Sequence, residues 1–321
     1  MRAAFLLKKV GSALVTIFFV LSFNFYLFRV LPGNPVSLLF RGVTFTPAQM
    51  ENLEAQFGLN QPLWVQYIIY LKNTVTGNFG ISYQTRTPVG DMVFPALMNT
   101  LILLLPATAI SIAVGIGIGM IAAWRRGTKE EVAMSGTTLV LYCMPTFWLG
   151  LLLLVMGVLY LGLPVGGMFT ISFGPENAFA RFSDLLQHMA LPLATLVLGL
   201  VGQYVLVMKG SLLDVLTEDY MVTARAKGIR RRKLMWDHGF RNAVLPMVTL
   251  MALNIGLSFG GAIQTETIFS WPGIGLLTYR AILSRDYPAL QGAFLVIAVA
   301  VILANLIADL LYPFLDPRVV A

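Results

Sequence analysis

Residues 101–124 read Leu101-Ile-Leu-Leu-Leu-Pro-Ala-Thr-Ala-Ile-Ser-Ile-Ala-Val-Gly-Ile-Gly-Ile-Gly-Met-Ile-Ala-Ala-Trp124, an apolar block without one charged side chain. A helix needs about 20 such residues to cross the hydrocarbon core of a bilayer. The block therefore predicts a membrane-spanning helix.

Five more apolar blocks lie along the chain, at Val10–Val30, Val132–Leu161, His188–Met208, Ala243–Thr265 and Ala289–Pro313. Pro106, Pro145 and Pro192 interrupt three of the six, but in a membrane bundle neighbouring helices and hydroxyl side chains satisfy the freed backbone groups. The blocks predict an all-α polytopic membrane protein with about six transmembrane helices.

The first block raises the alternative of a cleaved signal peptide. Its apolar run is long, and Leu31-Pro-Gly-Asn-Pro35 follows it where a cleavage site would need small residues. We therefore expect an uncleaved first span and treat residues 1–321 as one transmembrane domain.

Composition agrees with a membrane protein, since the chain is 57% hydrophobic and 12% charged. Soluble domains carry roughly twice that charged share. The net charge of +7 suggests either nucleic acid or anionic lipid as a partner. Most basic residues lie in short loops beside apolar blocks, which favours membrane lipid and no nucleic acid.

The single cysteine, Cys143, lies in an apolar block and is expected to be buried and inert.

The loops alternate in charge. With the N-terminus placed in the cytoplasm, most of the 22 basic residues fall on the inner side, although the outer segments are longer. This bias follows the positive-inside rule and predicts that both termini are cytoplasmic. The expected location is a bacterial or archaeal-type plasma (inner) membrane, crossed several times.

The longest polar stretch, about residues 31–99, is then extracytoplasmic. Trp64, Tyr67, Ile68, Tyr70 and Leu71 recur in it at helical spacing. Gly77-Asn-Phe-Gly80 marks a turn. We predict an ordered outer loop region with one or two short helices.

The inner loop, about residues 209–242, contains the most informative motif. Thr217 can cap a helix whose first turn carries Glu218 and Asp219, and Gly228 suits the left-handed position that ends it. Small side chains at Ala224 and Ala226 allow close approach to another surface. The pattern predicts a short docking helix on the cytoplasmic face; the alternative is a basic loop that only obeys the positive-inside rule.

Thr223-Ala-Arg-Ala-Lys-Gly228, with its end at Leu245-Pro246, resembles the "EAA" signature of ABC importer permeases. The resemblance implies that this segment is a coupling helix seated in a groove of an ATPase, through Thr223, Ala224, Ala226, Gly228, Leu245 and Pro246. The first position is Thr223 rather than Glu. The long interval from Gly228 to Pro246 is similar to that in the branch importing dipeptides, oligopeptides and nickel complexes.

Further segments resemble the same branch in the expected order: Leu59-Asn-Gln-Pro-Leu-Trp-Val-Gln-Tyr67, Gly77-Asn-Phe-Gly-Ile-Ser82, Met144-Pro-Thr-Phe147, Glu266-Thr-Ile-Phe-Ser-Trp-Pro-Gly-Ile-Gly275 and Asp316-Pro-Arg318. The resemblance implies a complex with a sister permease subunit, two ATPase domains or subunits and an extracytoplasmic solute-binding protein. Peptides are the expected solutes, with nickel chelates, glutathione or glycosides as alternatives.

No phosphate-loop motif occurs in the chain, so ATP and Mg are expected in the partner subunits, with no cofactor, metal or catalytic residue in this one. Two other classes compete with the importer. A self-sufficient secondary transporter would carry internal repeats and a buried ionisable pair, and neither is clear in the sequence. A membrane anchor that assembles partners would need the docking helix but no pathway.

Four outer residues, Glu266, Trp271, Pro272 and Gly273, are candidates for an outer gate or pathway. A carboxylate at the membrane border usually faces protein or water. Glu266 would either line the solute exit or hold the Trp271–Gly273 loop. The Gly-x-x-x-Gly step from Gly115 to Gly119 predicts close helix packing, inside the bundle or against another subunit.

Overall fold

The computed structural model describes residues 2–30, 46, 49, 60–170 and 177–315. Most of the predicted outer residues 31–59, and the closing Asp316-Pro-Arg318, lie outside that part. Its regular elements are helices, accompanied by one isolated bridge between Ile81 and Pro88. The all-α prediction is confirmed.

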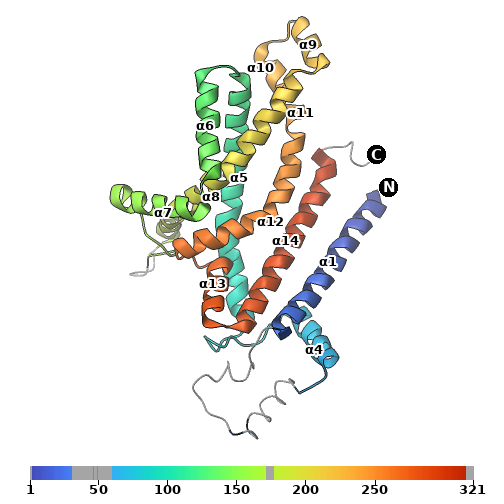
Figure 1. Ribbon diagram of the computed structural model, residues 1–321, viewed down its shortest axis with the longest axis vertical. Helices are drawn as coiled ribbons and strands as arrows, with labels where there is room; N and C mark the ends of the chain where they lie inside the picture. Colours follow the sequence, from blue (N-terminus) through green and yellow to red (C-terminus); the bar gives the residue numbers. More distant parts are fainter. Residues whose placement is uncertain (1, 31–45, 47–48, 50–59, 171–176, 316–321) are drawn as a thin grey trace. The chain divides into compact units, whose positions relative to one another are not determined.

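The helices, labelled in Figure 1, follow one another in this order: α1 (Arg2–Val30), α4 (Leu63–Val75), α5 (Val89–Trp124), α6 (Lys129–Cys143), α7 (Thr146–Met156), the π-helix η1 (Gly157–Leu161), α8 (Ala178–Leu216), α9 (Asp219–Ala226), α10 (Arg231–Lys233), the π-helix η2 (Leu234–Phe240), α11 (Arg241–Ala243), α12 (Leu245–Ile268), α13 (Ile274–Ser284) and α14 (Tyr287–Leu315).

The described residues group into two compact units. The first consists of Met1–Ala4, Leu101–Trp271 and Ala304–Ala321, and the second of Phe5–Thr100 and Pro272–Leu303. Helices α1, α5 and α14 each contribute to both units. The assignment of residues 1–321 to one transmembrane domain stays a prediction.

Four helices are long and apolar enough to cross a membrane: α1, α5, α8 and α14. The count rises to five if the bent pair formed by α6 with α7 and η1 is one span. The remaining predicted span coincides with α12, a helix of 24 residues. The polytopic membrane class is confirmed, whereas the number six stays a prediction.

The third predicted span, Val132–Leu161, is not one straight helix. It breaks between α6 and α7, and the two parts are bent by 104°. Met144 is extended, with φ −71° and ψ 128°. Proline disfavours the helical conformation for the residue before it and lacks the N–H that would continue the helix, so Pro145 ends α6. Cys143, just before the bend, is exposed on this chain, which corrects its expected burial.

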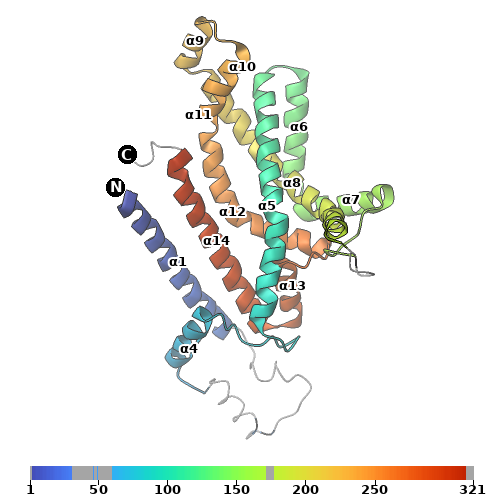
Figure 2. The same ribbon diagram turned by 180° about the vertical axis from the view of Figure 1, so that it is seen from behind.

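Helix α8 packs closely against α5 within the first unit. A Cβ on Gly115 would lie 2.4 Å from Cβ of Tyr204, and one on Gly119 would lie 2.7 Å from Cβ of Met208. Small residues permit such an approach between membrane helices. Figure 2 shows α5 and α8 crossing. The Gly115–Gly119 step therefore serves packing inside the chain.

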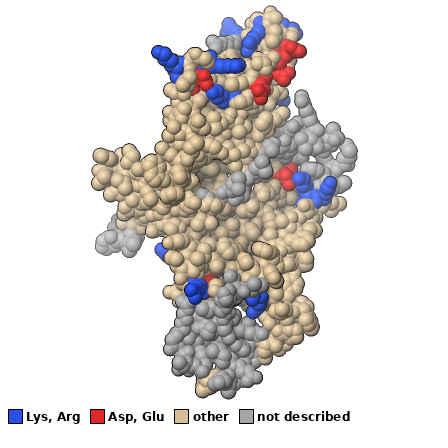
Figure 3. All heavy atoms as spheres, viewed as in Figure 1, with Lys and Arg blue, Asp and Glu red and all other residues tan. Residues whose placement is uncertain are grey.

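Charged side chains gather at one end of the first unit, over α9, α10 and the loop between α5 and α6, while the flank of α6 and α7 is uncharged (Figure 3). At that end the ammonium of Lys209 on α8 donates to the carboxylate of Glu131 on α6 and, over 2.8 Å, to the hydroxyl of Ser135. This charged contact ties α6 to the last turns of α8.

In the second unit, α4 is the helix predicted around Trp64–Leu71. Its inner face meets α1, where the hydroxyls of Tyr67 and Ser22 lie 2.6 Å apart and Asn24 donates to the Tyr70 hydroxyl over 3.2 Å. Trp64 and Ile68 are exposed on its outer face. Gly77 after α4 has φ +76°, which confirms the predicted turn.

Candidate functional site

The predicted inner loop, about residues 209–242, overlaps α8, which extends to Leu216, so only its part from Thr217 onward lies outside that helix. The hydroxyl of Thr217 donates to the carbonyl of Asp214 over 2.7 Å, so this residue closes α8. The expectation that Thr217 caps the next helix is wrong, because α9 begins after Glu218 without a side-chain cap. Asp219 lies in the first turn of α9, where a negative charge is stabilised by the helix dipole.

The end of α9 is a Schellman motif. The N–H of Gly228 donates to the carbonyl of Arg225 over 2.9 Å, and the N–H of Ile229 donates to that of Ala224 over 3.4 Å. These two bonds are the pair that defines the motif, which requires a left-handed residue between them. Gly228 has φ +73°, so its predicted left-handed conformation is confirmed.

Helix α9 is held on a small apolar core of its own. Met221, Ala224 and Leu234 are buried together, with Val215, Leu216 and Ile229 packed around them. The other face of α9 is exposed. Thr223, Ala226 and Gly228 all lie on the exposed side. The two alanines therefore point in different directions: Ala224 anchors the helix and Ala226 is available to a partner.

Leu245 and Pro246 begin α12, beyond η2 and α11, and do not belong to α9. The segment that connects α9 to α12 is held by hydrogen bonds from one side chain. The amide of Asn242 donates to the Tyr220 hydroxyl over 3.0 Å and to the His238 carbonyl over 2.9 Å. These links join α9, η2 and α11 into one block, the docking block (residues 218–243). Sequence reasoning missed Asn242, because its partners are set by the fold.

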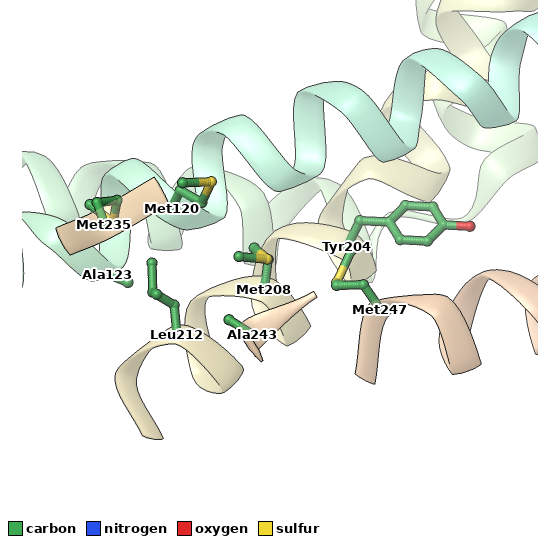
Figure 4. Close-up of a cluster of buried hydrophobic side chains, with 8 residues drawn as sticks. All are labelled: Met120, Ala123, Tyr204, Met208, Leu212, Met235, Ala243 and Met247. Atoms are coloured by element: carbon green, nitrogen blue, oxygen red, sulfur yellow. The ribbon is translucent and has the colours of Figure 1, made fainter. Parts of the chain in front are cut away.

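A methionine cluster joins the docking block to the membrane helices, as Figure 4 shows. Its buried members come from α5 (Met120 and Ala123), α8 (Tyr204, Met208 and Leu212), η2 (Met235), α11 (Ala243) and α12 (Met247). Methionine is flexible and polarizable, so it keeps contact while neighbours shift. Any displacement of η2 therefore presses on side chains of α5, α8 and α12.

Two of the four candidate outer residues, Glu266 and Trp271, belong to the first unit. Both are fully buried, and the N–H of Trp271 donates to the carbonyl of Glu266 over 2.9 Å. The carbonyl of Phe269 between them accepts from the N–H of Gly167 over 2.9 Å. The end of α12 is thus a closed turn, held by residues 166–167.

Pro272 and Gly273 belong to the second unit, where they are held by α5. The amide of Asn99 donates to the carbonyl of Pro272, and the hydroxyl of Thr100 accepts from the N–H of Ile274, each over 2.9 Å. The start of α13 is therefore fixed to α5 by two side chains.

A buried carboxylate, Asp286, organises the loop before α5. It is 2% exposed and accepts four hydrogen bonds: from the Ser82 hydroxyl, from the N–H groups of Tyr83 and Gln84 over 3.0 and 3.2 Å, and from the Ala289 N–H over 3.3 Å. Burial and the nearby Asp286 carboxylate raise the pKa of Tyr83 to about 12. Tyr83 is therefore a neutral phenol at physiological pH.

Replacing Asp286 with asparagine is expected to loosen residues 82–85. One of the two acceptor oxygens becomes an NH₂ group, which faces donors and leaves them unsatisfied, at a cost of about 2 kcal/mol. Amide exchange of Tyr83 and Gln84 should become roughly thirtyfold faster by mass spectrometry. Asp91→Asn, at an exposed position in the first turn of α5, is the control. Unchanged exchange in Asp286→Asn would contradict the role of this carboxylate.

The fold and the docking block define a class: a multi-spanning membrane protein with an ordered helical platform at its charged end. The family model described as the binding-protein-dependent transport system inner membrane component matches residues 115–321. The model of the N-terminal part of such membrane components matches residues 2–104. The chain belongs to this family, the permease subunits of ABC importers, and is a multi-pass inner-membrane protein.

Relatives match along nearly the whole chain. The dipeptide transport system permease protein DppB of Escherichia coli is 37% identical over 98% of both chains. The di/tripeptide transport system permease protein DppB of Pseudomonas aeruginosa is 35% identical over 98% of both. The oligopeptide transport system permease protein AppB of Bacillus subtilis is 33% identical over 99% of both.

Proposed function

We propose that this chain forms one half of the pathway through which an ATP-driven importer moves di- and oligopeptides across the inner membrane. The observation that carries this proposal is the match to peptide permeases over 98% of the chain. The other half is a sister permease subunit. Two ATPase domains or subunits hold ATP and Mg, and an extracytoplasmic solute-binding protein delivers the peptide.

The docking block is the part of the chain that we assign to the ATPase. Its exposed residues Thr223, Ala226 and Gly228 offer small side chains to a groove, and Arg225 and Lys227 add positive charge. Closure of the ATPases on ATP displaces α9, and the buried Met221 and the methionine cluster pass that displacement to α5 and α8. Differential contacts of a few kcal/mol are enough to change the state of such a bundle.

This assignment supports the predicted orientation. The docking block and both chain termini are on the cytoplasmic side. The Trp271–Gly273 loop and α4 are outside, where the solute-binding protein docks. Leu245 and Pro246 begin the span that follows the docking block and carry its motion into α12.

We assign the loop from Glu266 to Gly273 to the outer gate. Trp271 fills a buried position, so Trp271→Phe keeps most of the packing and Trp271→Ala leaves a cavity. Uptake is expected to fall more than tenfold in Trp271→Ala, while the complex still assembles, and to stay within about twofold in Trp271→Phe. Normal uptake by Trp271→Ala would remove the gate assignment.

The experiment that tests the function has two readouts. The tagged chain is purified gently from native membranes, and its companions are identified by mass spectrometry. The complex is then reconstituted in liposomes and tested for ATP-dependent uptake of a labelled dipeptide. Recovery of a second permease, ATPases and a binding protein, with uptake that needs ATP, is expected. A chain that purifies alone and transports without ATP would replace this proposal with a secondary transporter.

A further inference from the structure

The second unit contains a cavity beside the start of α13. Its volume is about 340 Å³, which is in the range of small-molecule sites. One wall is apolar and comes from α5 and α13, with Met92, Pro95, Leu276 and Leu277. Pro272 and Gly273 of the outer loop complete that wall. The cavity therefore has a surface suited to an apolar side chain.

The polar lining residues include two charged groups, Arg280 and Asp286, together with Gln84 and Ser284. Arg280 and Ser284 lie on α13, like the apolar Leu276 and Leu277. The carboxylate of Asp286 is already engaged by its four donors and is buried. Arg280 is exposed, and its guanidinium forms no ion pair with any residue that the structure describes. The accessible charge of the cavity is therefore positive.

We propose that this cavity is a peptide subsite in which Arg280 binds the α-carboxylate of the cargo. This inference rests on the proposed function and names the part of the cargo that the permease recognises. A guanidinium binds a carboxylate through two parallel hydrogen bonds, and such charge-assisted bonds are the strong ones. We assign Gln84, which also lines the cavity, to the peptide backbone, and the apolar lining residues to the last side chain.

The shape of the site favours a small cargo over a surface of the binding protein. Protein partners meet over roughly 800 Å² on each side, which an open recess of this size does not provide. The backbone around the site is fixed, because the Asp286 carboxylate accepts from the backbone N–H of Gln84 and the Ser284 hydroxyl donates to the Arg280 carbonyl over 2.9 Å. Binding of a dipeptide therefore has to order the exposed side chains of Gln84 and Arg280 but not the backbone that carries them.

The test uses the complete importer complex in lipid nanodiscs, without its binding protein, and two probes: labelled dialanine and dialanine amidated at its C-terminus. Equilibrium binding of dialanine should be roughly tenfold or more weaker in Arg280→Gln, since a hydrogen bond to a charged group is lost. The amidated dialanine lacks the carboxylate, so its binding to the wild type should be as weak as the binding of dialanine to Arg280→Gln. Arg280→Lys should retain part of the affinity, because it keeps the charge without the two-pronged geometry.

Lys72→Gln is the matched control, because it removes one exposed positive charge from α4 without touching the cavity. Equal binding of dialanine and its amide to the wild type would overturn the proposal. A second result would also overturn it. In that case Arg280→Gln binds dialanine as the wild type does, but needs a higher concentration of binding protein to stimulate its ATP hydrolysis. That result would assign Arg280 to a carboxylate of the binding protein. Failure of the proposed function is seen separately, as absence of dialanine uptake by the wild-type importer.

Discussion

Gly119→Ala is expected to disrupt the packing of α5 on α8 and to lower the amount of folded chain in the membrane. The new Cβ would lie 2.7 Å from Cβ of Met208 and 2.8 Å from the carbonyl oxygen of Val205. The carbonyl oxygen is a backbone atom, so rotation of a side chain cannot relieve the clash and the two helices must move apart. We expect a loss of about 3 kcal/mol in the free energy of unfolding, at the upper end for overpacking.

The measurement is equilibrium unfolding of the purified chain in mixed detergent micelles, together with its level in the membrane. Gly117→Ala is the matched control, two residues away on the same helix, where a Cβ would meet nothing within 4 Å. Its stability should be unchanged or higher, because alanine favours helix over glycine by up to about 1 kcal/mol. Equal stability of Gly119→Ala and Gly117→Ala would show that α5 and α8 do not approach as described.

Gly228→Val is expected to abolish coupling between the ATPases and transport while the chain stays folded in the membrane. Gly228 has φ +73°, and a Cβ there would meet nothing within 4 Å. The effect therefore comes from backbone strain alone, of about 2 kcal/mol for a β-branched residue. The Schellman turn would open, and the exposed face of α9 would lose its shape. Uptake and the ATP hydrolysis stimulated by loaded binding protein should both fall more than tenfold.

Gly228→Asn separates strain from volume, because asparagine tolerates the left-handed conformation and has a side chain of similar size. Its uptake should remain within about threefold of the wild type. Gly210→Ala is a second control, at a glycine of α8 with open space and no positive φ. Loss of uptake in Gly228→Asn equal to that in Gly228→Val would mean that the glycine is needed for close contact with a partner instead.

Several features followed from residues that are neighbours in the chain. Long apolar blocks require a membrane, so most spans were predictable from composition and length. The end of α9 was predictable at Gly228, because a glycine after a helical stretch signals a left-handed residue. The start of α9 was not predictable in the same way. Thr217 lies between two helices, and its hydroxyl bonds to the end of α8 instead of capping α9.

Other features depend on contacts between distant residues. The bend of 104° at Pro145 could not be predicted from the sequence, because membrane helices often contain a proline without breaking. The two alanines of α9 looked equivalent until the core around Met221 and Leu234 turned Ala224 inward. The methionine cluster gathers side chains from five helical elements, and no local pattern marks them.

Sequence alone thus determined that this chain is an α-helical membrane protein with a short helix that ends at Gly228, because hydropathy and helix-end signals are encoded within a few turns of chain. Its motifs carried the resemblance to ABC importer permeases. Only the tertiary structure decided which face of α9 is exposed, which glycines bring α5 onto α8, and that Asp286 serves a loop some 200 residues earlier. Those properties depend on which side chains meet after the helices pack. The same holds for the cavity beside α13, where Arg280 has no ion-pair partner in the part of the chain that the structure describes.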